Sequence, residues 1–477
     1  MRTASLLAAA VAAAFVSPGL AQVAPTTLPS GGSVSAGTAT ISTPADGKMQ
    51  IDQASQRAII NWNSFSIGSA AHVNFSQPGA ASVALNRVLG NDPSQIFGRL
   101  TANGQVFLTN PAGVLFAPGA SVNVGALFAS TLSITDQDFL AGTYRFQNGG
   151  GAGTVVNQGT IVTPNGYTAL VGPQVRNDGV IIARLGSVAL AAGDRVSLDM
   201  IGDGLINVSV EAGALNAAAI NTGRIEADGG RVLLTARGAD SLLDGVVNSS
   251  GVIRANSLIE RNGEVVLNAG SVQVSGSVET LGGAATVQGT GSVNISGSNA
   301  IDAGAGSILL TSGAANAGVV TTGGFNIGSG SVTISGESTL SAPGGTIAIG
   351  TGNLTLTSST SIGTSGAAVQ VTGNTVTVAG NTTTLTAGGG PVRLSEEELK
   401  MRVLATNITG SGATIGQMVR RAASDAVTVA NQATVPNHRV GQTTEALNGP
   451  IGRIAPMEHS IVGTGVTLPT EGFFSLR

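Results

Sequence analysis

Two short phrases built on asparagine and glycine recur after residue 150, and they constrain the fold more than any other feature of this chain. The first phrase is Asn-x-Gly-x-Ile, and it stands at 157–161, 177–181 and 221–225, with a looser copy at 248–253. In the second, a glycine is followed by alternating apolar positions, and copies begin at Gly186, Gly230, Gly263, Gly270, Gly291, Gly330 and Gly345. Each copy predicts a turn and a short strand with one face inward.

Short strands with Gly and Asn corners, at a coil length of roughly 20 residues, predict an all-β fold, a right-handed parallel β-helix. One coil cannot bury its inward Val, Ile and Leu side chains, whereas a stack of coils buries them continuously. We expect the repetitive β-helix to span 147–390. The alternative is an array of β-sandwiches with antiparallel strands joined by hairpins, and the irregular spacing of the copies leaves it open.

Composition limits the possible functions. Hydrophobic residues make up 42% of the chain and charged residues 10%, so ordinary disorder is excluded. The chain has no cysteine, so burial and backbone pairing must hold it together without disulfides. Its net charge of −4 argues against nucleic acid as a partner.

The two ends of the chain differ from the repetitive middle. Residues 1–21 are typical of an export signal peptide, with Arg2 before an apolar core and small residues at the cleavage site. At the other end, Ser395 and Glu398 form a capping box that predicts a helix to about 405, and a second helix is expected across 415–429. We interpret 391–477 as a partly helical or irregular segment that serves as a cap, an anchor or a partly disordered tail.

The stretch 104–116 places Asn-Pro-Ala-Gly between two fully apolar runs. Asn suits the first position of a type I turn, Pro fixes φ at the second, and Gly suits the fourth. Ala112 stands at the third position, where a type II turn would need positive φ, so type I is expected. Apolar residues at every position of 106–108 and 114–116 indicate strands covered on both faces.

Further motifs stand before this turn at 60–68, 73–75, 84–88 and 92–98, and another follows it at 119–125. In this order and spacing they resemble the N-terminal secretion domain of two-partner secretion exoproteins, the filamentous haemagglutinin family. The resemblance covers about residues 30–146, and we place the domain at 22–146, where it also begins and caps the β-helix. Ala112 departs from the family's usual Asn-Pro-Asn-Gly turn. The matching residues are Asn61, Trp62, Phe65, Asn86, Arg87, Asn110, Pro111, Gly113 and Val114.

The resemblance implies a secreted or cell-surface protein that leaves through the periplasm and the outer membrane. Its partner would be a dedicated outer-membrane β-barrel transporter with periplasmic domains, and its role would be that of an adhesin with an unknown surface ligand. The alternative is a secreted β-helix enzyme that acts on polysaccharide, which needs a dense outward cluster of carboxylates. Asp and Glu total 26 in the whole chain without such a cluster, so we expect no enzyme activity.

Candidate catalytic, metal or cofactor sites are scarce. The three histidines, His72, His438 and His459, lie far apart in sequence, and Asp199 with Asp203 is more simply a pair of solvated turn acids. The glycine-rich run 149–153 lacks the Lys and the helix that a phosphate-binding loop requires. The sequence therefore predicts no catalytic residue, no metal site and no cofactor.

Overall fold

The structure is a computed structural model that describes residues 23–200, 205–239, 245–258 and 262–295 and, beyond residue 300, the strands named below. The signal peptide predicted at 1–21 lies outside the described residues. The chain divides into two compact units. The first contains residues up to 261 together with 266–270, and the second contains 262–265 and everything from 271 onward.

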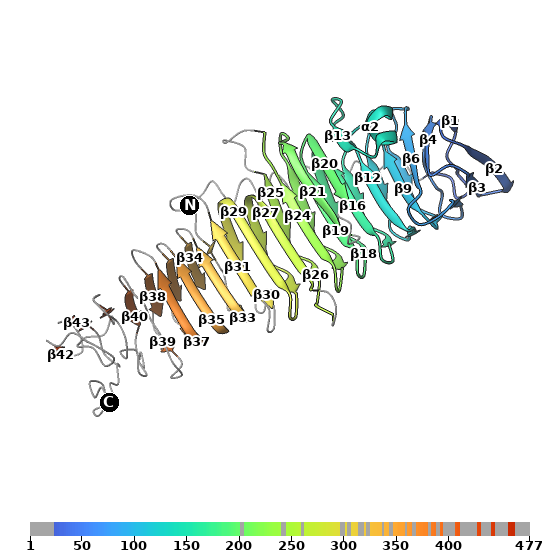
Figure 1. Ribbon diagram of the computed structural model, residues 1–477. Coiled ribbons are helices and arrows are strands. Elements are labelled where there is room, and N and C mark those ends of the chain that lie inside the picture. The colour runs from blue at the N-terminus through green and yellow to red at the C-terminus, as the bar shows by residue number, and fades with distance from the viewer. Residues whose placement is uncertain are drawn as a thin grey trace. The chain divides into compact units, whose positions relative to one another are not determined.

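The first unit is a parallel β-helix in which three strands per coil stack on the corresponding strands of the next coil (Figure 1). Its first column is β4 (Arg57–Trp62), β6 (Val83–Val88), β9 (Gln105–Thr109), β12 (Ala126–Ser130), β16 (Tyr167–Gly172), β19 (Ser187–Ala192) and β24 (Arg231–Ala236). The second is β3 (Lys48–Gln53), β5 (His72–Ser76), β8 (Arg99–Ala102), β11 (Ser121–Asn123), β15 (Thr160–Val162), β18 (Val180–Ile182), β23 (Arg224–Glu226) and β26 (Val252–Arg254). The third is β7 (Ser94–Ile96), β10 (Val114–Phe116), β14 (Val155–Asn157), β17 (Gln174–Asn177), β22 (Ala218–Asn221) and β25 (Val246–Ser249).

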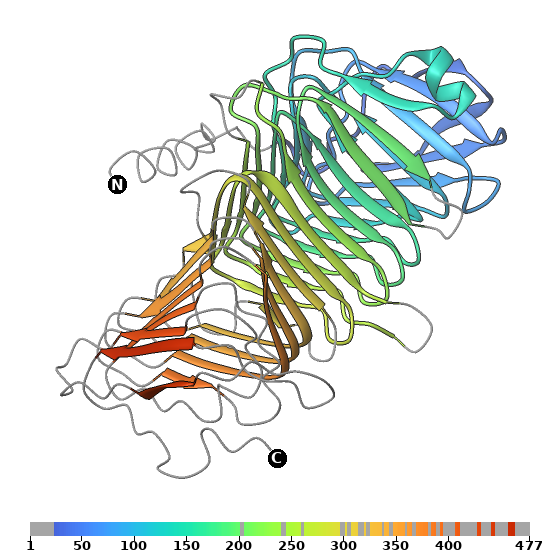
Figure 2. The ribbon, with the colours of Figure 1, turned by 60° about the vertical axis from the view of Figure 1, so that its left-hand side comes forward.

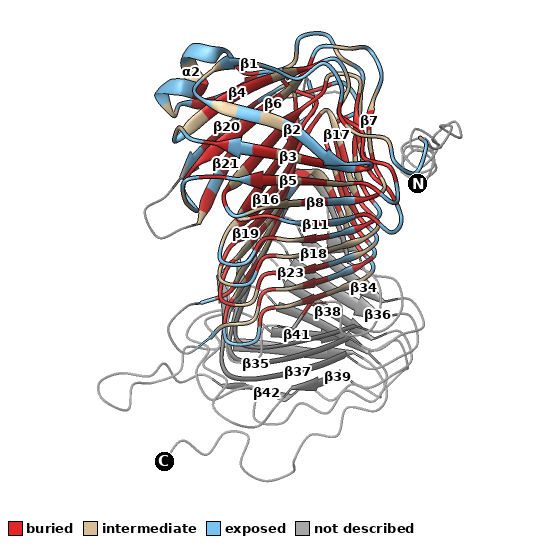
Figure 3. Ribbon diagram, turned by 90° about the vertical axis from the view of Figure 1, so that its right-hand side faces the viewer, coloured by how far each residue is buried: buried red, intermediate tan, exposed pale blue. Residues whose placement is uncertain are grey.

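The interior of these coils is filled by apolar side chains that repeat in register. In the second column one inward position is occupied in successive coils by Val73, Leu100, Val122, Ile161, Ile181, Ile225 and Ile253. All of them are buried, and Figure 3 shows buried residues recurring along the stacked strands of successive coils. The parallel pairing confirms the predicted β-helix and rules out the β-sandwich array for the described coils.

Antiparallel strands close the N-terminal edge of this unit. β1 (Ser33–Ala36) pairs antiparallel with β4, and β2 (Ala39–Ala45) pairs antiparallel with β3. An open edge strand presents unpaired N–H and C=O groups that invite association. The two strands therefore form the N-terminal cap that the sequence predicts.

A small antiparallel sheet is inserted outside the coils. It contains β13 (Tyr144–Gln147), β20 (Arg195–Met200) and β21 (Ile206–Ala212), and the short helix α2 (Asp136–Ala141) precedes it. Its Phe146 stacks on Phe128 of the coil with ring centroids 4.1 Å apart, and Phe128 lies 5.1 Å from Phe107. The insertion lengthens two coils, because α2 and β13 lie between β12 and β14 whereas β20 and β21 lie between β19 and β22. Figure 2 shows α2 beside the stacked strands. The inserted residues explain the irregular spacing of the repeats, which left the β-sandwich array as an alternative fold.

The second unit is also made of strands, which range from 2 residues in β30 to 12 in β29, and most of their pairings are parallel. Strand β27 (Glu264–Val274) has residues in both units. The other strands are β28 (Ser277–Glu279), β29 (Ala284–Ile295), β30 (Ile301–Asp302), β31 (Ser307–Ser312), β32 (Val319–Val320), β33 (Phe325–Ser335), β34 (Ser338–Ala342), β35 (Ile347–Thr357), β36 (Thr360–Thr364), β37 (Val369–Ala379), β38 (Thr383–Ala387), β39 (Val392–Leu394), β40 (Thr406–Gly410), β41 (Val427–Ala430), β42 (Val440–Thr443) and β43 (Met457–Val462).

The structure tests only part of the two helices predicted near the C-terminus. The helix predicted at 395–405 lies outside the described residues, and so does most of the one predicted at 415–429. Residues 427–429 belong to strand β41, so the predicted end of that second helix is wrong. Valine and threonine fill β41, and they favour a pleated strand when a neighbouring strand is available for pairing. The role of 391–477 as a cap, anchor or tail stays a prediction.

Candidate functional site

The Asn-Pro-Ala-Gly segment forms a tight turn between β9 and β10. The Asn110 carbonyl accepts a hydrogen bond from the Gly113 N–H at 3.0 Å. The Asn110 Oδ1 accepts a second bond from the Ala112 N–H at 2.9 Å. Gly113 has φ of 125°, whereas Ala112 is not among the residues with positive φ. This backbone excludes a type II turn and agrees with the predicted type I turn.

Asn110 is fully buried, and its side chain fastens the turn to the preceding coil. Its Nδ2 donates to the Asp92 carbonyl and to the Ser94 Oγ, both at 3.0 Å. Its backbone N–H donates to the Ser130 carbonyl of the following coil at 2.9 Å. A buried amide is costly unless its donors and acceptors are satisfied, and here both ends of the carboxamide have partners. Asn110 therefore connects three consecutive coils.

The glycine-rich run 149–153 lies directly over this turn. The Gly153 N–H donates to the Pro111 carbonyl at 3.2 Å. A Cβ added at Gly153 would stand 2.4 Å from the Gly113 nitrogen, and one at Gly151 would stand 2.6 Å from the Pro111 oxygen. Glycine is needed because two backbones approach closely. The sequence shows that this run is not a phosphate loop, but nothing in its pattern reveals which turn it covers.

Trp62, Phe65 and Asn86 form a second group at the ends of neighbouring strands. The Trp62 Nε1 donates to the Asn86 Oδ1 at 3.0 Å, and the Trp62 and Phe65 rings meet edge to face with centroids 5.4 Å apart. The Asn86 Nδ2 donates to the Phe107 carbonyl at 3.2 Å. All three side chains are buried. These buried contacts therefore hold the first coils together. In the folded chain a partner protein cannot contact the three side chains.

Asn61 and Arg87 lie opposite each other in the β4–β6 register, and Arg87 in turn lies opposite Thr109 in β9. The Arg87 guanidinium forms an ion pair with Asp136 of α2 at 2.6 Å and donates to the Ile134 carbonyl at 2.9 Å. Arg87 thus holds the inserted helix against the coil. The register places these two residues one strand position before the turn that begins at Asn110.

The predicted residues therefore occupy the same ends of the adjacent strands β4, β6 and β9, but they do not converge on one pocket. Val114 completes the turn group, because it is buried and pairs with Ser94 on one side and Val155 on the other. Pro111 and Ala112 are half-buried. Little of the surface of the folded turn is therefore accessible to solvent.

A buried asparagine ladder runs along a different corner of the coils, at the opposite end of the third strand column from the turn, because Asn157 lies opposite Phe116 at the end of β10. The Asn157 Nδ2 donates to the Asn177 Oδ1 at 2.7 Å, and the Asn177 Nδ2 donates to the Asn221 Oδ1 at 2.8 Å. The Asn221 Nδ2 then reaches the Ser249 Oγ at 3.4 Å. These residues are the first positions of the repeated Asn-x-Gly phrase. The sequence predicts a turn at each copy of the phrase. The hydrogen bonds between asparagines of successive coils could not be predicted, because they depend on the strand register between coils.

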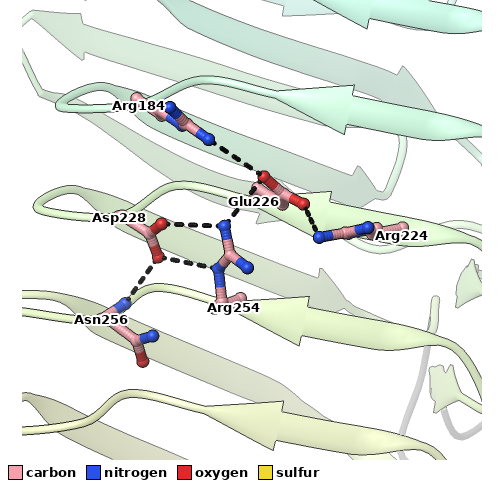
Figure 4. Close-up of polar contacts among 6 residues, drawn as sticks. All are labelled: Arg184, Arg224, Glu226, Asp228, Arg254 and Asn256. Carbon is pink, nitrogen blue, oxygen red and sulfur yellow. Dashed lines mark hydrogen bonds and ion pairs between the residues drawn. The ribbon is translucent and has the colours of Figure 1, made fainter.

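A second polar cluster joins successive coils through a buried carboxylate (Figure 4). Glu226 is almost fully buried and pairs with Arg224 of its own strand, with Arg254 at 3.0 Å and more loosely with Arg184 at 3.9 Å. Arg254 also pairs with Asp228 at 3.0 Å, and the Asp228 Oδ1 accepts the Asn256 N–H at 3.1 Å. Sequence reasoning missed this cluster because its members are spread over about three coils.

Among the described residues, two titratable side chains have clearly shifted pKa values. Burial lowers the pKa of His72 from 6.5, and the charges of Arg99 and Lys48 lower it further. Burial raises the pKa of the Tyr167 hydroxyl well above 10.0, with Tyr144 as a second cause. Both shifts favour the neutral form.

Within the described residues no three His, Asp or Glu side chains gather as metal ligands. Asp199 lies on β20, while its predicted neighbour Asp203 is outside the described residues. His72 lies on β5 and His459 on β43, and His438 is outside the described residues. In this part of the chain we also find no helix with the length and hydropathy to cross a membrane.

Comparison with known proteins gives a family match over residues 26–280, to the family described as TPS secretion domain. A heme/hemopexin-binding protein of Haemophilus influenzae is 38% identical over 224 residues, which cover 45% of this chain and 24% of that protein. A second heme/hemopexin-binding protein of Haemophilus influenzae is 46% identical over 110 residues, 23% of this chain and 12% of that protein.

These matches span no more than about a quarter of the length of either relative. The crystal structure of the HMW1 secretion domain from Haemophilus influenzae aligns with a TM-score of 0.46 and 23% identity, over 91% of this chain and 99% of that one. The family match runs past residue 146, where the sequence analysis places the end of the domain. Because this match covers more than half of the chain, the protein belongs to the TPS secretion-domain family, the two-partner secretion exoproteins that are exported across the outer membrane.

Proposed function

We propose that this chain is the exported member of a two-partner pair and that an outer-membrane β-barrel transporter with periplasmic domains recognises its N-terminal coils. The observation that carries the proposal is the family match over 26–280, which includes the capped coils and the turn at 110–113. The antiparallel cap supports it, because a sealed first coil gives the parallel stack a defined starting point.

Within this function, the turn acts while the chain folds. The Asn110 side chain is fully buried in the folded protein, so a transporter cannot contact it there. One of its hydrogen bonds lies within the turn, to Ala112, and two reach back 18 and 16 residues to Asp92 and Ser94 of the preceding coil. Contacts of short sequence separation have a low loop-closure cost and form early. The turn would therefore nucleate the first coils as the chain emerges outside the cell.

After export, the protein acts as an adhesin, retained at the surface or released. Two features support this role. The coils carry outward-facing polar strand positions over a continuous apolar interior, and the described carboxylate cluster at Glu226 is neutralised by arginines. The test is adherence of bacteria that express the chain with its transporter to epithelial cells. Adherence above that of cells with the transporter alone is expected, and equal adherence would contradict the role.

Binding of haem or of a haem-carrying protein is the second candidate. The identity of 38% to a heme/hemopexin-binding protein over 224 residues favours it. Titration of the purified protein with haemin, followed at the Soret band, and capture of purified hemopexin on immobilised protein would test it. Saturable binding of either one would replace the adhesin proposal.

We propose that the protein is not an enzyme, although a polysaccharide-cleaving β-helix remains the rival hypothesis. Such an enzyme needs free carboxylates flanking the scissile bond. Both carboxylates of the largest described cluster, Glu226 and Asp228, are instead held by arginines. Incubation with acidic and neutral polysaccharides should release no reducing ends above those released by heat-denatured protein.

A further inference from the structure

A cavity of about 680 Å³ opens at one corner of the first unit. Successive coils form it, with Ala80 and the corners at 102–105, 123–126 and 164–167. Leu205 and Ile206, at the start of β21, supply an apolar wall. Its volume falls within the range of about 300–1,000 Å³ that is usual for small-molecule sites. Nothing in the export function uses it.

The polar groups at this cavity are amides and one hydroxyl. The Tyr167 hydroxyl donates to the Gln105 Oε1 at 2.8 Å, which fixes the carboxamide and leaves the two Nε2 hydrogens of Gln105 for another acceptor. Asn123 and Asn165 are exposed at the rim, and neither carboxamide has a hydrogen-bond partner among the described residues. The Asn103 carboxamide is already used by the Gln77 backbone.

Among the residues that the structure describes, no charged side chain lines the cavity. Burial keeps the Tyr167 hydroxyl neutral by raising its pKa well above 10.0, so it cannot act as a phenolate ligand at ordinary pH. An anionic ligand would meet no cation, and haem would find neither an axial imidazole nor a partner for its propionates. The lining therefore selects for an uncharged ligand that is rich in hydrogen-bonding groups.

An extended peptide also carries such groups, but it binds most simply by adding a strand to an open edge. The strands at this corner have no open edge. β9 lies between β6 and β12, β12 between β9 and β16, and β16 between β12 and β19. Only side-chain amides remain to make hydrogen bonds, and these suit hydroxyl groups in many orientations.

We propose that this corner cavity, lined by Gln105, Asn123, Asn165 and Tyr167, binds a neutral saccharide. The amides bond the sugar hydroxyls, and the carbon–hydrogen face of a ring lies against Leu205, Ile206 and Pro164. This deepens the proposed adhesin function and rests on it only for its biological use, because sugar binding is a property of the purified protein.

The experiment is calorimetric titration of the mature full-length protein with maltotriose, cellotriose and triacetylchitotriose. Saturable binding of at least one of them is expected, with a dissociation constant of about 1 mM or tighter. The variants Asn123→Ala and Gln105→Glu should each weaken binding about tenfold, because each removes amide hydrogen bonds. Glu at position 105 keeps the acceptor for Tyr167 and so preserves the fold.

The matched control is Ser121→Ala, which changes an exposed residue on the same strand and the same outer face but outside the cavity lining. It should bind as the unaltered protein does. Three results would overturn the proposal: no binding of any of the sugars, equal weakening by Ser121→Ala, or preferential binding of trialanine or sialyllactose at this cavity. Lost adherence with intact sugar binding would reject the adhesin role alone.

Discussion

At the scale of the residue, the asparagine ladder shows how a single side chain contributes to stability. Asn177 lies in the middle, accepting from Asn157 and donating to Asn221. Asn177→Ala leaves a buried donor and a buried acceptor unsatisfied. The free energy of unfolding should fall by about 3 kcal/mol. Urea denaturation of this variant beside Thr160→Ala, at an exposed strand position, measures it. An equal effect of both changes would remove the ladder's special role.

His72 gives a prediction about pH. Its pKa is lowered in the folded chain, so the unfolded chain binds the proton more readily below 6.5. The stability contributed by the neutral imidazole is fully present above pH 6.5 and is lost as the pH falls toward the folded pKa. Acidification from pH 7.5 to 5.0 should therefore lower the urea midpoint of the unaltered protein more than that of His72→Gln. Equal decreases would show that His72 does not contribute.

At the scale of the element, the Glu226 cluster connects neighbouring coils through charge. Glu226→Gln would leave Arg224 and Arg254 side by side without their shared carboxylate. Breaking a buried ion pair costs about 3 kcal/mol or more. The melting temperature of this variant should fall well below that of Glu211→Gln, which changes an exposed residue on β21. A melting temperature equal to that of the control would show that the arginines are satisfied by solvent.

The elements differ in how far they could be predicted from the sequence. The period of apolar positions predicts the coils, because the inward column that contains Ile161, Ile181 and Ile225 repeats a local pattern. The turn at Asn110 is likewise set by local chemistry. The inserted sheet of β13, β20 and β21 could not be predicted, because its core forms between Phe146 and the distant Phe128. For the same reason the contact between 149–153 and the turn is hidden in the sequence.

In the molecule as a whole, we expect folding of the successive coils to be coupled to export. The N-terminal cap gives the stack a starting edge, the buried turn ties the first coils together, and later coils add strands to an existing template. Each coil buries its apolar column against the preceding one. A chain that begins to fold outside the outer membrane would be held there, because folded coils cannot slide back through a pore.

The most direct test compares secretion with stability in Asn110→Ala, Pro111→Ala and Asn177→Ala. Asn110 and Asn177 are both fully buried amides, so their alanine variants should have similarly lowered melting temperatures. Pro111→Ala should lower the free energy of unfolding by about 1 kcal/mol. Secretion of both turn variants into the medium should fall, by up to about fivefold for Pro111→Ala and by more for Asn110→Ala, while the purified proteins still fold, because each kcal/mol added to the nucleation barrier slows folding about fivefold. Asn177→Ala lies within the family match but in a later coil than the turn, so it should be exported nearly normally if the first coils nucleate folding. Equal export of Asn110→Ala and Asn177→Ala would contradict a special role for the turn.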